Sequence, residues 1–219
     1  MRAAAQRAGR DPDAVTLVAV TKYAGLGDVR ALLETGLVSE AGESRVQDAE
    51  RRKAELGELA GKVRWRLIGH LQTNKAKKAA TVFDAVDSVD SERVAAALDA
   101  AREGMTPLPV MVQVKLTDKE SQFGVAPEEL PGLLEALKKY PRLKVEGLLG
   151  IAPDVEPVEA ARPAFKLLRE LRDRRLPGGK LNMGMSRDFE IAVEEGADLV
   201  RIGTQIFSQP SPASLEAPA

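Results

Sequence analysis

One lysine of this chain stands where it could carry out carbonyl chemistry. Lys22 follows the short β-branched run at 16–20 and Thr21. An amine at the end of a buried strand is partly removed from water, and a desolvated lysine is a nucleophile toward aldehydes and ketones. The residue type and its position therefore suit a Schiff base. A lysine that extends from the rim into solvent is the alternative interpretation of this residue taken alone.

Two glycine–hydroxyl segments in the second half of the chain could bind a phosphate. They are the segment 184–186, which ends in Ser186, and the pair Gly203-Thr204. Glycine lets backbone N–H groups approach an anion, and Ser186 precedes a predicted helix whose N-terminal dipole favours negative charge. Each segment alone could be a simple turn, with Ser186 as a helix cap. Together with a carbonyl-reactive lysine, they indicate pyridoxal phosphate, or else a phosphorylated sugar aldehyde or ketone.

These residues come together only if the chain alternates between strands and helices. Short apolar or β-branched runs predict eight strands, and the segments between them have the spacing of at least seven amphipathic helices. Strands separated by helices form a parallel sheet, and eight such units in about 200 residues fit a compact (β/α)8 TIM barrel, an α/β fold. An open doubly wound sheet is the competing architecture, but its glycine fingerprint is missing after the first strand. The predicted strands cover 16–20, 38–41, 63–68, 82–86, 108–114, 144–151, 180–183 and 199–202.

In such a barrel the carboxyl ends of the strands share one face, which is where active groups lie. We therefore expect the polar residues after the strands to converge on one mouth. We expect residues 1–207 to form a single domain and the proline-rich segment 208–219 to be a disordered tail. The strand-end residues are Lys22, Glu43, Ser44, Arg45, His70, Gln72, Asp87, Ser88, Lys115, Asn182, Ser186, Arg201 and Thr204.

Composition excludes several classes of site. The chain has no Cys and one His, which excludes disulfides, thiolate metal sites, cysteine nucleophiles and any site with two imidazoles. Lys plus Arg is 32 against 33 for Asp plus Glu, so the whole chain has no attraction for nucleic acid or an anionic membrane. An all-oxygen Mg²⁺ or Ca²⁺ site remains formally open, but no metal site is predicted.

Neither a secretory signal nor a membrane span is recognisable in the sequence. Residues 1–14 hold three Arg and two Asp without an apolar stretch, and the uncharged run at 105–114 contains two Pro and is too short to cross a bilayer. We therefore expect a cytoplasmic protein. The basic segment 72–78 could recruit a phosphate or nucleic acid, but a solvated helix is the preferred interpretation.

At these same residues the sequence resembles the pyridoxal phosphate homeostasis proteins. These are single-domain barrels of PLP fold type III, related to the N-terminal domain of alanine racemase. The matching segments occur in order along nearly the whole chain, so the resemblance is specific. They are VAVTK at 18–22, GESRVQ at 42–47, WRLIGHLQTNK at 65–75, FGV at 123–125, GLLGIAP at 147–153 and LNMGMSRDFEIAVEEGADLVRIGTQIF at 181–207.

The resemblance implies a binding site for pyridoxal 5′-phosphate (PLP) with a Schiff base on one lysine and a phosphate on the hydroxyl loops. It also implies that Arg201 faces the pyridine nitrogen, with His70 and Met183 near the ring. Ser44 stands where the family usually has Asn, and its side chain is shorter and lacks the amide. The implied cofactor-binding residues are Lys22, Ser44, His70, Met183, Ser186, Arg201, Gly203 and Thr204.

Two classes of function are compatible with these residues. The first is a non-catalytic protein that holds PLP as a reversible Schiff base in vitamin B6 homeostasis, with PLP-dependent apoenzymes as candidate recipients. The second is an enzyme, either a racemase-like PLP enzyme or a lysine aldolase that would use acid–base groups such as Glu43 and Asp87. We favour the carrier, a monomer without catalytic residues, because Arg201 cannot accept a proton from the pyridine ring and no second base is evident.

Overall fold

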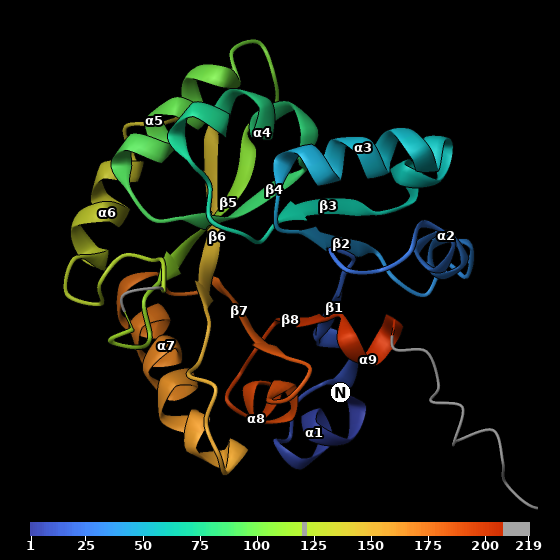
Figure 1. Cartoon of the computed structure of the whole chain (residues 1–219). Coiled ribbons are helices and arrows are strands. Elements are labelled where there is room, and N and C mark those ends of the chain that lie inside the picture. The colour runs from blue at the N-terminus through green and yellow to red at the C-terminus, as the bar shows by residue number, and fades with distance from the viewer. Residues whose placement is uncertain (120–121, 208–219) are drawn as a thin grey trace, which may run out of the picture.

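The computed structural model describes residues 1–119 and 122–207. These residues form a closed barrel of eight parallel strands, with helices around the outside (Figure 1). The predicted TIM barrel is therefore confirmed, and the open sheet is wrong. The predicted disordered tail at 208–219 lies outside the described residues.

Each strand is followed by helical structure, as the alternation predicts, and α1 (Arg2–Arg7) precedes the first strand. The strands are β1 (Thr16–Val20), β2 (Glu40–Glu43), β3 (Arg64–Leu67), β4 (Ala85–Val89), β5 (Leu108–Val114), β6 (Leu143–Gly150), β7 (Lys180–Met185) and β8 (Leu199–Ile202). The α-helices that follow them are α2 (Leu26–Glu34), α3 (Val46–Leu56), α4 (Ala76–Val82), α5 (Glu92–Ala101), α6 (Leu130–Leu137), α7 (Arg162–Arg175), α8 (Phe189–Glu194) and α9 (Thr204–Phe207). Short 3-10 helices are η1 (Pro12–Ala14), η2 (Gly57–Lys62), η3 (Thr73–Lys75) and η4 (Val158–Ala161).

The first and last strands close the barrel by pairing with each other. Val18 lies opposite Glu40 of β2 on one side and opposite Arg201 of β8 on the other. In Figure 1 the blue β1 accordingly lies beside the red β8. The first and last strands of the barrel are therefore neighbours, and residues near positions 20 and 200 share one part of the mouth.

Two strands differ from their predicted positions because they carry charged residues into the sheet. β2 and β4 begin two and three residues later than expected and include Glu40, Glu43 and Asp87, all of which are buried. Hydrophobic periodicity does not reveal such residues, since their burial depends on partners from other strands. Arg66 provides one of these partners, with its guanidinium 2.9 Å from a carboxylate oxygen of Asp87.

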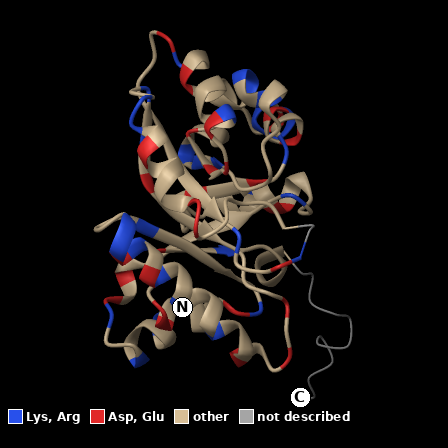
Figure 2. Ribbon diagram, turned by 90° about the vertical axis from the view of Figure 1, so that its left-hand side faces the viewer, with Lys and Arg blue, Asp and Glu red and all other residues tan. Residues whose placement is uncertain are grey.

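Most of the apolar core lies between the strands and the surrounding helices, where Trp65, Phe165 and Leu98 are fully buried. A smaller apolar cluster is formed by Val18, Met111, Leu149 and Leu199. On the outer helices, Lys and Arg are interspersed with Asp and Glu (Figure 2). None of the helices in the described part of the chain is both long and apolar enough to cross a membrane.

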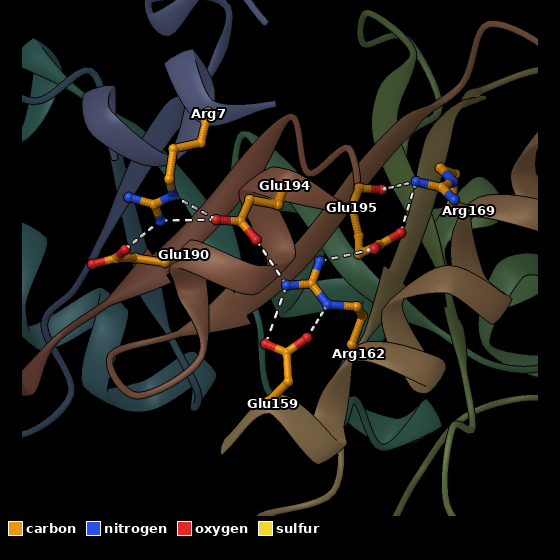
Figure 3. A network of polar contacts seen from close by, with 7 residues as sticks. All are labelled: Arg7, Glu159, Arg162, Arg169, Glu190, Glu194 and Glu195. Atoms are coloured by element: carbon orange, nitrogen blue, oxygen red, sulfur yellow. Dashed lines mark hydrogen bonds and ion pairs between the residues drawn. The ribbon is translucent and has the colours of Figure 1, made fainter. Parts of the chain in front are cut away.

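An ion network joins three outer elements, α1, α8 and the η4–α7 segment (Figure 3). Arg7 contacts two carboxylates of α8, and Arg162 contacts Glu194 of that helix at 2.8 Å. We call it the outer network. Its residues are Arg7, Glu159, Arg162, Arg169, Glu190, Glu194 and Glu195.

Candidate functional site

A cavity of about 540 Å³ opens at the carboxyl ends of the strands and is lined by five of the eight implied cofactor-binding residues, whereas most of the other strand-end polar residues do not line it. Its walls come from the ends of β1 and β8 and from the loops after β6 and β7, with an apolar side that includes Val155, Val158 and Phe207. A volume of this size is typical of small-molecule sites. The predicted residues that line it are Lys22, Ser186, Arg201, Gly203 and Thr204.

Lys22 reaches the cavity because the residue before it is fixed to the sheet. The Thr21 hydroxyl donates to Glu43 Oε1 at 2.7 Å, and its backbone N–H donates to the carbonyl of Gly42 at 3.0 Å. Lys22 itself is exposed, and its amine lies 4.9 Å from the centre of the Tyr23 ring. The expectation that burial desolvates this amine is therefore wrong, and the alternative of a lysine open to solvent at the rim describes this structure, because β1 ends at Val20 and Lys22 lies beyond it.

The two hydroxyl loops lie against each other and close one side of the cavity. The Gln205 side chain donates from Nε2 to the carbonyl oxygen of Ser186 at 2.9 Å, which joins the loops after β7 and β8. Gly184 has a φ of +90°, and a Cβ there would lie 2.5 Å from the Cβ of Ala192. Only glycine therefore suits this turn. A Cβ at Gly203 would lie 3.0 Å from the carbonyl oxygen of Val20.

Asp188 shapes the first of these loops. One oxygen of its carboxylate accepts a hydrogen bond from the backbone N–H of Met185 at 2.6 Å, and the residue is buried at the cavity wall. Burial raises the pKa of Asp188, an effect that this backbone hydrogen bond opposes. The side chain therefore holds the backbone on either side of Ser186 in place.

Arg201 lies at the base of the cavity and is almost completely buried. Its Nη1 donates to both the carbonyl oxygen and the side-chain oxygen of Asn182, at 2.9 and 2.5 Å, and its Nη2 donates to the carbonyl of Gly150 at 3.0 Å. Burial lowers the pKa of Arg201 to about 10, so the group is a cation at neutral pH. The cavity thus has a buried positive charge at one end.

Behind Arg201, polar contacts continue through the inside of the barrel. The amide nitrogen of Asn182 donates to Asp87 Oδ2 at 2.8 Å, and Arg66 Nε donates to the same oxygen at 2.9 Å. The other guanidinium edge of Arg66 lies 3.8 Å from Glu40. Burial raises the pKa of Asp87, and the two arginines oppose this effect. We call these five residues the inner network.

Three other predicted site residues do not line this cavity. His70 lines a separate hollow of about 350 Å³, stacks on the Phe123 ring at 3.8 Å and lies 3.3 Å from an Asp90 oxygen. Met183 belongs to the apolar core, because its neighbour Asn182 faces the barrel interior and side chains alternate along a strand. The backbone of Ser44 lies against Gly69, where a Cβ would come within 2.3 Å of the Ser44 carbonyl oxygen.

Sequence reasoning gave no role to several residues that build the site. The sequence places Asn182 among the strand-end polar residues without a specific role, and it indicates no role for Asp188. Their positions within the matching segment 181–207 were the one available signal. Arg187 was also missed; its guanidinium pairs with Asp154 at 2.6 Å and with Glu156, which joins the loops after β6 and β7 at the cavity rim.

The donor set of the cavity fits an aldehyde that carries a phosphate and a ring acceptor. A primary amine, two glycine–hydroxyl loops and a guanidinium surround one space. The amine suits the aldehyde, the loops suit a phosphate, and the guanidinium suits an unprotonated ring nitrogen, because it can only donate. In the described residues no group of three His, Asp or Glu side chains could hold a metal ion.

Known proteins share both the sequence and the fold. The family model of the alanine racemase N-terminal domain matches residues 1–210. A pyridoxal phosphate homeostasis protein of Pseudomonas aeruginosa is 43% identical over 209 residues, which is 94% of this chain and 90% of that protein. PipY of Synechococcus elongatus PCC7942, solved with PLP bound, is 34% identical with a TM-score of 0.81, over 94% of this chain and 98% of that one.

Alanine racemase of Clostridium difficile 630 shares the fold more distantly. It is 16% identical with a TM-score of 0.71, and the match covers 91% of this chain but only 54% of the racemase. The likeness therefore concerns the barrel, and about half of the racemase chain has no counterpart in the match.

Proposed function

This chain belongs to the alanine racemase N-terminal domain family and to its pyridoxal phosphate homeostasis proteins, and from this we propose that it binds PLP reversibly in intracellular vitamin B6 homeostasis. The observation that carries the proposal is that one cavity is lined at once by Lys22, both hydroxyl loops and Arg201. The relative PipY has been solved with PLP bound, which supports the same ligand here.

The residues of the cavity would hold different parts of the cofactor. PLP supplies an aldehyde, with which an amine forms a covalent bond that water can break. Lys22 provides that amine, and its exposure gives water access to the bond, so release needs no additional machinery. Ser186, Gly203 and Thr204 bind the phosphate, and Arg201 donates to the ring nitrogen.

The other predicted contacts belong to the same proposal. Ser44 and His70 follow β2 and β3 at the mouth of the barrel, and we propose that they approach the cofactor from that side. Met183 lies in the apolar core, and we propose that it affects the cofactor indirectly, through β7, the strand that also carries Asn182. We further propose that the protein is a cytoplasmic monomer and passes PLP to PLP-dependent apoenzymes, without a role for nucleic acid or membranes.

A carrier is favoured over a racemase-like enzyme because the ionisable groups of the cavity are poorly placed for proton transfer, and the Asp188 carboxylate, for example, is occupied by the backbone N–H of Met185. Lys22 can serve one face of a bound amino acid, and racemisation needs a base on each face. Tyr23 is 90% exposed and lies against the same amine, while the Tyr140 hydroxyl is bonded to Glu92 and does not line the cavity. Arg201 leaves the ring a weak acceptor of electrons, since it cannot take up a proton from it.

A lysine aldolase is disfavoured by the positions of its candidate acid–base groups. Glu43 is buried and bonded to Thr21 and Arg52, and Asp87 is buried and bonded to Asn182 and Arg66. Neither carboxylate lines the cavity. An open-chain sugar bound at Lys22 would therefore not meet them.

The decisive experiment is to load the protein with PLP, reduce it with borohydride and map the modified peptide by mass spectrometry. We expect the label on Lys22, and Lys22→Ala should lose both the label and the yellow absorption while it keeps its fold, because no buried apolar group is removed. Lys115→Ala is the matched control, since Lys115 also lies just after the end of its strand. A label on Lys75 or Lys115 in the wild type would overturn the assignment.

Turnover is tested separately, by incubating the loaded protein with single-enantiomer amino acids in deuterated water. We expect no α-deuteration or racemisation at ordinary enzyme rates, on the order of 1 s⁻¹ or above. Turnover at such rates that disappears in Lys22→Ala would establish an enzyme instead of a carrier.

A further inference from the structure

Within the described residues, the hydrogen-bond acceptors of Arg201 are all neutral, and this makes the side chain of Asn182 important. The guanidinium bonds to the Asn182 amide oxygen and to two backbone carbonyls, whereas the nearest carboxylate in the inner network, that of Asp87, is one residue further away. Backbone carbonyls are held by the sheet and do not depend on a side chain. The Asn182 amide is therefore the adjustable contact that orients the guanidinium.

Asparagine suits this place because its two ends have opposite hydrogen-bonding character. An amide oxygen only accepts and an amide nitrogen only donates. The nitrogen of Asn182 is bonded to Asp87 Oδ2, so the oxygen faces Arg201. Asp87 is in turn held by Arg66 Nε on the same oxygen. The direction of the amide, and with it the acceptor offered to Arg201, is thus set from inside the barrel.

The contacts of Arg201 leave donors for a ligand. A guanidinium carries five N–H groups, and the hydrogen bonds of Arg201 to described residues are three. Arg201 also lines the cavity. We infer that Asn182 and Asp87 are positioning residues, which hold Arg201 so that its remaining N–H groups face the ring nitrogen of PLP. This inference rests on the proposed function.

A purely structural role makes a different prediction, and a cofactor analogue separates the two. In 1-deaza-PLP a C–H group replaces the ring nitrogen, while the aldehyde and the phosphate are kept. If Asn182 acts through Arg201 on the ring nitrogen, its loss weakens the binding of PLP and spares the analogue. If Asn182 only supports the barrel, both ligands lose affinity equally.

The experiment measures the dissociation constants of PLP and 1-deaza-PLP by absorbance titration for the wild type, Asn182→Leu and Gln113→Leu. Gln113 is the matched control, because it is also a buried amide of a barrel strand, but it donates to the Phe123 carbonyl and not toward Arg201. We expect PLP affinity to fall about tenfold or more in Asn182→Leu, the size of a hydrogen bond to a charged group, with little change for the analogue. Gln113→Leu should leave the ratio of the two constants unchanged.

Equal losses for both ligands in Asn182→Leu would overturn the inference. Wild-type protein that binds neither ligand would instead overturn the proposed function, so the two failures are distinguishable. If Asn182→Leu does not fold by circular dichroism, Asn182→Ala takes its place, because it removes the amide without adding bulk. A folded Asn182→Ala should lose affinity for PLP and not for the analogue, and equal losses for both ligands would contradict the inference.

Discussion

The inner network and the outer network both pair Arg with Asp or Glu, but the first lies inside the barrel and the second lies mostly at the surface, where only Glu195 of its described residues is buried. In the inner network Arg66 and Asp87 have side chains that are 2% and 0% exposed, whereas Arg7 and Glu190 of the outer network are 52% and 56% exposed. Inside the barrel, Asn182 links the charged side chains of Asp87 and Arg201, and Arg201 lines the cavity. Outside, the charges join α1 to its neighbouring helices (Figure 3).

The difference shows that the burial of an ion pair decides how much stability is lost when the pair is broken. A buried charge has lost its hydration, so removal of its partner leaves an uncompensated group in a medium of low polarity. An exposed pair exchanges its partner for water at little loss. We therefore expect substitutions in the inner network to affect stability and ligand binding strongly, and substitutions in the outer network to affect only the attachment of helices.

The largest effect is expected for Arg66→Leu. This change leaves Asp87 with one donor fewer and Glu40 without its buried cation, and breaking a buried pair in this way costs about 3–5 kcal/mol. Urea unfolding followed by circular dichroism measures the loss. A change below about 1 kcal/mol, the range of exposed pairs, would remove the distinction between the two networks.

An intermediate effect is expected at the hydroxyl loops, which are only partly buried. Ser186→Ala and Thr204→Ala should each weaken PLP binding by about 1–3 kcal/mol, because each removes a hydrogen bond to a charged phosphate. Pyridoxal, which lacks the phosphate, is the control ligand and should lose much less affinity. Equal losses for both ligands would place the phosphate elsewhere.

The two networks should also respond to pH in opposite directions. The pKa of Asp87 is raised, so its contribution to stability is present below its unfolded value of 3.8 and is lost as pH rises through the folded pKa. The pKa of Glu194 is lowered by its arginine hydrogen bonds, so its contribution is present above 4.5 and is lost as pH falls through the folded pKa.

Free energies of unfolding measured from acid to neutral pH test this difference. The stability of Asp87→Asn, measured relative to the wild type, should increase as pH rises. Glu194→Gln should lose less stability than the wild type on acidification. If the stability of both variants varied with pH in parallel with the wild type, the raised pKa of Asp87 and the lowered pKa of Glu194 would be contradicted.

The smallest effect is expected for Arg7→Gln. Its guanidinium contacts Glu190 and Glu194 at the surface, where salt screens the attraction. The midpoint of urea unfolding should shift slightly at low ionic strength and not at high ionic strength. A shift that persists in high salt would mean that α1 is held by more than exposed charges.

Sequence patterns predicted the elements far better than the inside of the barrel. Lys22 and the hydroxyl loops could be found because each follows a strand, and parallel strands place such residues at one face. The contacts of Asn182 with Asp87 and Arg201 could not be found, because they join residues of separate strands whose burial has no periodic signal. The exposure of Lys22 was one of two interpretations that the sequence left open, and the sequence could not decide between them because the exposure depends on how the chain leaves β1.

The stacking of His70 on Phe123 is another contact that the sequence could not predict. The two residues belong to loops after different strands, β3 and β5, and the spacing of residues within either loop does not connect them. A single histidine in the sequence could be named as a candidate, but its partners Phe123 and Asp90 appear only once the loops are folded over the mouth.

The pairing of β1 with β8 brings distant parts of the chain together at one cavity. Lys22 and Arg201 are 179 positions apart in the sequence, yet both line that cavity. Contacts between residues so far apart require closure of a long loop of chain, which costs conformational entropy. The groups proposed to hold PLP therefore come together only once β8 has paired with β1, and the gain of PLP binding during refolding would report closure of the barrel.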